Sequence, residues 1–288
     1  MPAPLAGLFE AINPARLQRR IDTRLGLDSL RSDRPRAPEL PLSLFVETIR
    51  PLGSLKYDNQ LNYFVGAFTG NAQTLQTLTY EYVFADWNAA RAEVIAPGGK
   101  VEALGFGYQR TLGVGRNHNW AHGFLILPEL SLTGNGFVGG TAFYTLAWKP
   151  TEESPWTLGG SAGANRASFA TRPADRPEGG AGSMMLRMPG AVGSGRTERE
   201  TEAEAWRPFA ALNVWYTFSP KLTVGLEADA YAHDRFGEYA VLPNLIWRPK
   251  RHFFLQLGAG WYEVAGHSQA VFAVRVNLLN PTQRVARD

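Results

Sequence analysis

The feature that most constrains this chain is an alternation of apolar and polar residues that runs, almost without a break, from about residue 42 to residue 280. A period of two is typical of β-strands with one apolar and one polar face. In the segment KLTVGLEADAYAHD, residues 221–234, Leu222, Val224 and Leu226 share one parity, whereas Glu227 and Asp229 fall on the other. A strand with aliphatic residues on one face and carboxylates on the other needs two different surroundings.

This alternation predicts about twelve antiparallel strands. Their ranges are 42–50, 76–86, 89–97, 101–112, 120–133, 137–149, 156–170, 204–218, 221–233, 238–248, 252–264 and 269–279. The segment LNYFVGAF, residues 61–68, is a further candidate strand. Most ranges are close to the ~9–11 residues with which a tilted strand crosses a bilayer.

The segments between the predicted strands alternate in length. Tight turns are predicted for DWN, TEESP, SPK and RPKR, at 86–88, 151–155, 219–221 and 248–251. Long loops are predicted at the opposite end of the strands, over residues 51–75 and 171–203. The second of these is rich in glycine, proline and charge, which predicts mobility. Short turns at one rim and longer loops at the other are typical of outer-membrane barrels.

Two architectures explain the alternation: a soluble sandwich or barrel with an apolar core, and a membrane barrel with an apolar outer wall and a polar lumen. Three observations favour the membrane barrel. The polar faces carry many small residues, and their mid-strand charges balance. Finally, all tryptophans except Trp215 lie near predicted strand ends, where interfacial girdles form; they are Trp87, Trp120, Trp148, Trp156, Trp206, Trp247 and Trp261.

Charged residues at mid-strand polar positions are predicted to line the lumen, to screen solutes and to pair across the barrel. They are Glu81, Arg91, Glu93, Arg207, Glu227, Asp229, Arg248 and Arg275. Many other inward positions are glycine or alanine. Large side chains such as Phe143 and Trp215 would fill only part of such an interior. We therefore expect the interior to hold water, the loop 171–203 or an N-terminal helix, and not packed apolar side chains.

The N-terminal part differs from the rest of the chain. Asn13-Pro14 predicts a helix start, and apolar residues then recur every four positions over residues 14–25, beside a basic face. We predict an N-terminal helical extension and proline-rich connector over residues 1–41, a barrel over 42–280 and a C-terminal tail over 281–288. The first residues lack the features of a secretory signal, so an exported protein would have a leader outside this numbering.

Composition excludes several function classes. The absence of cysteine excludes disulfides, thiolate metal sites and cysteine nucleophiles. A net charge of +3 is too small to indicate nucleic-acid binding. The histidines have no metal-binding spacing, and we predict neither a metal nor another cofactor.

Short motifs that suggest catalysis are better explained as parts of strands. Ser161 lies in GGSAG, a hydrolase-like motif, but within a strand pattern and not at a strand-to-helix turn. The pairs GFG at 105–107 and GVG at 113–115 open no helix, which argues against phosphate binding. His122 is a candidate for a lipid-facing hydrolase site, although no serine shares its face.

The hairpins YEYVFADWNAARAEVIAP and YTFSPKLTVGLEA resemble those of bacterial outer-membrane channel barrels of the phenol-degradation meta-pathway type. Asn13-Pro14-Ala15 is similar to the plug motif of fatty-acid and hydrocarbon channels. Unlike these families, the chain continues past its last strand without a terminal aromatic residue. The resemblance implies a bacterial outer-membrane location and passive passage of small solutes by a protein that is not an enzyme. The partners would be outer-membrane lipid, small solutes and a periplasmic or envelope protein bound through residues 1–41. The alternatives are a non-conducting barrel that anchors or houses a partner in an envelope assembly, and an outer-membrane lipid hydrolase.

Overall fold

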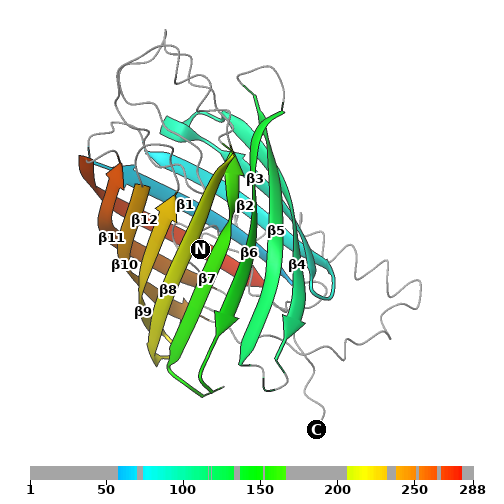
Figure 1. The fold of residues 1–288 in the computed structure, drawn as a ribbon, viewed down its shortest axis with the longest axis vertical. Helices are drawn as coiled ribbons and strands as arrows, with labels where there is room; N and C mark the ends of the chain where they lie inside the picture. The colour runs from blue at the N-terminus through cyan, green and yellow to red at the C-terminus, as the bar shows by residue number, and fades with distance from the viewer. Residues whose placement is uncertain are drawn as a thin grey trace.

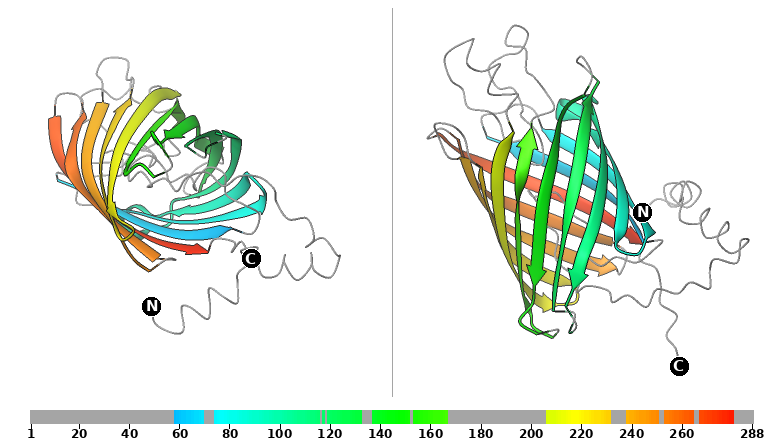
Figure 2. Two further views of the ribbon diagram at one scale, coloured as in Figure 1. Left: turned by 90° about the horizontal axis from the view of Figure 1, so that it is seen from below. Right: turned by 45° about the vertical axis from the view of Figure 1, so that its right-hand side comes forward.

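The structure, a computed structural model, is a closed antiparallel β-barrel of twelve strands (Figure 1). Each strand pairs with its neighbours in sequence, and the first strand pairs with the last, so that no sheet edge stays open. Seen along the barrel in Figure 2, the strands form a ring. The structure describes residues 58–69, 74–115, 117, 119–132, 137–151, 153–166, 206–231, 238–250, 253–264 and 267–280.

The strands are 8 to 14 residues long. They are β1 (Asn59–Phe68), β2 (Leu75–Ala85), β3 (Asn88–Ile95), β4 (Ala103–Val114), β5 (Trp120–Ser131), β6 (Phe137–Trp148), β7 (Trp156–Arg166), β8 (Arg207–Ser219), β9 (Leu222–Tyr231), β10 (Glu238–Lys250), β11 (Phe253–Val264) and β12 (His267–Asn280). A single 3-10 turn, η2 (Pro97–Gly99), lies between β3 and β4. No helix among the described residues is long and apolar enough to cross a membrane.

The predicted fold class is confirmed, with one difference at the N-terminal end of the barrel. The candidate strand at residues 61–68 is β1 and closes the ring, so the prediction of a long loop over residues 51–75 is wrong. The predicted strand at 42–50 lies outside the described residues, as do the helix at 14–25, the loop 171–203 and the tail 281–288.

The longest connection lies at one rim of the barrel, and three of the shortest lie at the other. At the rim where β1 begins and β12 ends, only two residues separate β2 from β3, β8 from β9 and β10 from β11. We call this the short-turn rim. The opposite rim, called the long-loop rim, joins β7 to β8 through residues 167–206. The predicted tight turns all lie at the short-turn rim.

Large apolar side chains cover the outer wall of the barrel. On β9, for example, Leu226 is 48% exposed, whereas Glu227 is fully buried inside. Aromatic residues gather near the rims of this wall: the rings of Trp156 and Tyr216 lie 4.8 Å apart near the short-turn rim. Trp206 and Trp261 are exposed near the long-loop rim. An apolar wall between two aromatic girdles is the lipid-facing surface of a transmembrane barrel.

The inner wall is more apolar than the sequence led us to expect. A cluster of buried apolar residues covers the inward positions of several strands; it contains Phe64, Leu125, Leu127, Phe143, Phe209, Ala211, Tyr231, Ala240, Leu242, Tyr262, Val271 and Ala273. The expectation that apolar side chains do not pack inside the barrel is therefore wrong for this part of the wall.

Apolar side chains pack inside the barrel because small residues of one strand lie opposite large residues of the next. Trp215 on β8 lies opposite Gly225 on β9, and a Cβ added to this glycine would overlap the indole ring. A Cβ added to Gly107 would likewise lie 2.9 Å from a side-chain carbon of Leu127 on β5. The small inward residues therefore accommodate large side chains of neighbouring strands, and do not leave all of that space open.

Candidate functional site

The inner wall has a polar sector on β1, β2 and β3. Thr77, Thr79 and Glu81 are consecutive inward residues of β2, and all three are buried. Across the strand boundaries, Glu81 lies opposite Gln60 and Arg91. Polar side chains thus follow one another along the wall, from Gln60 near the short-turn rim to Thr77 near the long-loop rim.

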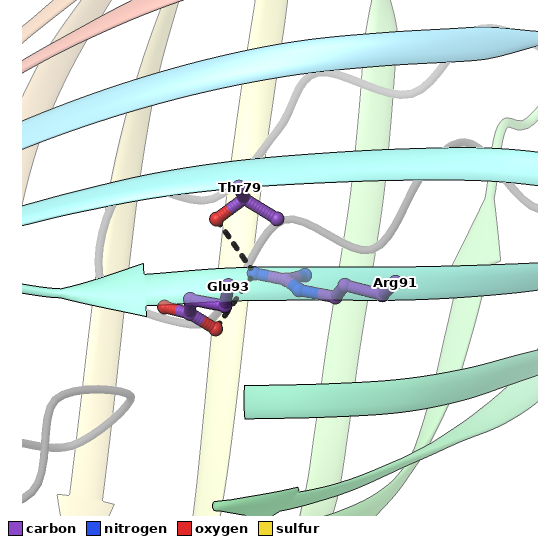
Figure 3. A network of polar contacts seen from close by, with 3 residues as sticks. All are labelled: Thr79, Arg91 and Glu93. Atoms are coloured by element: carbon purple, nitrogen blue, oxygen red, sulfur yellow. Dashed lines mark hydrogen bonds and ion pairs between the residues drawn. The ribbon is translucent and has the colours of Figure 1, made fainter. Parts of the chain in front are cut away.

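Arg91 is the centre of a small polar network in this sector (Figure 3). Its Nη2 donates to Thr79 Oγ1 at 3.3 Å and to Glu93 Oε2 at 3.4 Å. Glu93 is two residues further along the same strand, so this ion pair runs along the wall. The predicted pairing of Arg91 with a carboxylate of the inner wall is found, but this pair lies along one strand and does not cross the barrel, because a guanidinium reaches the next inward position of its own strand more easily than the far wall.

Two more arginines of the inner wall pack over aromatic rings. The guanidinium carbon of Arg275 on β12 lies 5.2 Å from the ring centre of Phe64, and that of Arg248 lies 5.6 Å from Phe254. Contacts of this kind stabilise a cation beside an apolar surface. They place positive charge against the wall formed by β10, β11, β12 and β1.

Neutral amide side chains form a second polar group on this wall, which the sequence analysis did not single out. Gln256 Nε2 donates to Asn244 Oδ1 at 3.4 Å. The side chains of Gln60 and Asn277 are fully buried, and neither makes a hydrogen bond with the described residues. These residues share the inward parity of the predicted charges, and that parity was the signal that could have found them.

Glu227 and Asp229 are successive inward residues of β9, and both are buried. Neither oxygen of Asp229 has a hydrogen-bond partner among the described residues. Towards the long-loop rim, the Tyr231 ring stacks on Phe209, with ring centres 6.2 Å apart. The wall of β8 and β9 therefore places carboxylates beside aromatic rings.

The structure places all eight predicted lumen-lining residues. Six of the eight are buried on the inner side of the wall, and Arg207 and Arg248 are partly buried. Their role in solute screening stays a prediction.

The structure also places the serine and the histidine that the sequence suggested as catalytic candidates. Ser161 donates to Thr145 Oγ1 at 3.1 Å in the middle of β7, and no strand-to-helix turn follows it. On the outer wall, His122 Nδ1 and the Tyr144 hydroxyl are 2.6 Å apart. No group of three or more potential metal ligands occurs in the part of the chain that the structure describes. His118, His233 and His252 lie outside that part.

Comparison with solved structures places this barrel among known architectures. The chain is similar to the NanC porin, at a TM-score of 0.52 and 11% identity, over 76% of this chain and 98% of that one. It has the fold of outer-membrane porins. A KdgM porin in complex with disordered oligogalacturonate matches at a TM-score of 0.50, with the same identity and coverage. An outer-membrane channel from Pseudomonas putida F1 matches at 0.49 and 11% identity, over 84% of this chain and 100% of that one.

No protein-family model and no curated protein match the sequence. At 11% identity, the structural matches show the fold alone. They confirm the resemblance of the sequence to outer-membrane channel barrels at the level of architecture. What passes through the barrel has to be argued from its own side chains.

Proposed function

We propose that this protein is a bacterial outer-membrane channel through which small solutes pass passively, and that it is not an enzyme. The observation that carries the proposal is the polar sector of the inner wall, which lies on β1 to β3 between Gln60 and Thr77. A barrel that serves only as an anchor has no need for a continuous group of polar and charged side chains on its inner wall.

The energetics of burial support a hydrated path along this sector. A buried polar group without a hydrogen-bond partner costs about 1–3 kcal/mol. The amide groups of Gln60 and Asn277 are buried in the wall and have no partner among the described residues. Water or a polar solute in the lumen would satisfy these groups. The charges at Arg91, Arg275 and Glu227 would then contact the solute and screen it.

The alternative is a non-conducting barrel that anchors or houses a partner in an envelope assembly. The apolar cluster that includes Leu125, Leu242 and Tyr262 favours it, because this cluster fills part of the interior. Residues 1–41 are the segment that we propose for contact with a periplasmic or envelope partner. A lipid hydrolase is the weakest candidate, since His122 contacts a tyrosine hydroxyl and not a serine.

Solute flux into liposomes tests the proposal. Purified protein would be folded into vesicles, and folding would be verified by its altered gel migration without heating. The vesicles would then be placed in isotonic arabinose, glucose or raffinose, which are uncharged solutes of increasing size. We expect swelling faster than that of protein-free vesicles, with a rate that falls as the solute becomes larger. If vesicles with folded protein swell no faster than protein-free vesicles in every sugar, the channel proposal is wrong and the anchor is favoured.

A further inference from the structure

Asp229 is a buried carboxyl group of the described inner wall whose surroundings provide little compensation. It is 2% exposed, and neither carboxylate oxygen has a hydrogen-bond partner among the described residues. The next inward residue of the strand, Glu227, is a second buried carboxylate. A buried charge is stable only when an opposite charge or hydrogen bonds compensate for its lost hydration. The surroundings of Asp229 therefore indicate which kind of group it can bind.

The strand register gives these surroundings. Asp229 lies opposite Ala211 on β8 and opposite Ala240 on β10. Both flanking side chains are single methyl groups, so neither offers the carboxylate a hydrogen bond or an opposite charge. The same register places Asn213 and Leu242 opposite Glu227.

Aromatic rings lie on the side of Asp229 that faces the long-loop rim. The next inward residue of β9 is Tyr231, whose ring stacks on Phe209. The Phe209 ring in turn meets Phe143 edge-on, with ring centres 5.8 Å apart. These rings belong to the apolar cluster of the inner wall. A solute that reaches Asp229 from this rim would pass an aromatic surface first.

The basic side chains that the structure describes on the inner wall lie at other inward positions. Arg91 pairs with Glu93 on β3, and Arg275 packs over Phe64. Arg207 is the first residue of β8, and Arg248 lies near the opposite end of β10. None of the inward positions next to Asp229 on β8 and β10 carries a positive charge.

We propose that Asp229 and Glu227 form a binding site for organic cations that enter the lumen, with an ammonium or guanidinium group held by the carboxylates. Hydrogen bonds between a charged donor and a carboxylate are among the strongest in proteins. Aromatic faces also attract a cation, most strongly where water is excluded. Phe209 and Tyr231 would therefore contact the cation or the apolar part of the same solute. A multivalent metal ion is disfavoured, because the described residues offer no group of three potential ligands.

This inference rests on the proposed channel, and an electrical measurement separates the two. Current through the full-length protein in a planar bilayer would be recorded in KCl while benzylammonium is added, with benzyl alcohol as the neutral control. We expect concentration-dependent block by benzylammonium and little effect of benzyl alcohol. D229N and E227Q, which keep the side-chain shape, should each weaken the block about tenfold or more. Gel migration without heating would verify that both variants fold.

The matched control is E129Q. Glu129 is also a buried inward carboxylate, but it lies on β5, away from the aromatic pair of β8 and β9. Its replacement should leave the block within about twofold of that of the unchanged protein. If the protein conducts but D229N is blocked as strongly as the unchanged protein, the cation site is wrong and the channel stands. The same holds if E129Q weakens the block as much as D229N does. Folded protein without conductance would overturn both.

Discussion

An arginine placed on the outer wall of β9 should destabilise the barrel according to its depth in the membrane. Leu222, Val224 and Leu226 point outward from the same strand at increasing distance from the short-turn rim. With a rise of about 3.3 Å per residue and a tilt of about 45°, Leu226 lies about 9 Å deeper than Leu222. In an apolar band about 25 Å tall, this difference separates the edge from the middle. Leu226 is also opposite Val214 and Pro243, near the centres of the neighbouring strands.

We expect Leu226→Arg to cost about 2–4 kcal/mol of unfolding free energy and Leu222→Arg about 0–1 kcal/mol, with Val224→Arg between them. The assay is equilibrium unfolding in guanidinium chloride with lipid vesicles, followed by tryptophan fluorescence. Leu226→Ala is the control that measures the lost leucine contacts alone. A penalty that does not depend on depth would refute the lipid-facing assignment of this wall. Monodisperse, folded protein in buffer without detergent would refute it as well.

Three further predictions concern the interior and the N-terminal segment. Gly225→Ala should cost about 1–3 kcal/mol in the same unfolding assay, because the new Cβ would overlap a tryptophan ring of β8. Gly160→Ala is its control, since a Cβ there would lie 3.4 Å from its nearest neighbour, and an equal cost would contradict the packing argument. Glu93→Gln should be more destabilising alone than together with Arg91→Met, because the single change leaves a buried guanidinium without its carboxylate; additive free energies in this double-mutant cycle would contradict the pairing. Deletion of residues 1–40 should increase the channel conductance, because this basic segment would be attracted to the inner-wall carboxylates, and an unchanged conductance would show that it does not restrict the opening.

Strand parity made most of this fold predictable. Because side chains alternate between the two faces of a strand, the position of one outward leucine predicts the direction of its neighbours in that strand as far as the next β-bulge. Leu226 and Glu227 were therefore assigned to opposite walls without coordinates.

The filling of the interior could not be predicted from parity alone. Trp215 covers Gly225 because the register of β8 and β9 places them opposite each other, and register is a property of the pair of strands. When only the sequence of its own strand is considered, Gly225 predicts open space in the lumen.

The pairing of the lumen charges could not be predicted from parity alone either. Opposite signs on the inward parity suggested pairs across the barrel, but a cross-barrel distance depends on the radius of the closed ring. The ion pair of Arg91 and Glu93 lies within one strand instead. Gln60 and Asn277 carry no formal charge, so the predicted set of lumen charges did not include them, although their amide groups line the same wall.

Single-channel recording tests the central claim most directly. Purified, folded full-length protein would be added to a planar bilayer in KCl, with heat-unfolded protein as the control. We predict discrete current steps of uniform size that scale linearly with voltage, because the polar sector of the inner wall would let hydrated ions pass. Insertion of folded barrels without any current above that of the bare bilayer would contradict the channel.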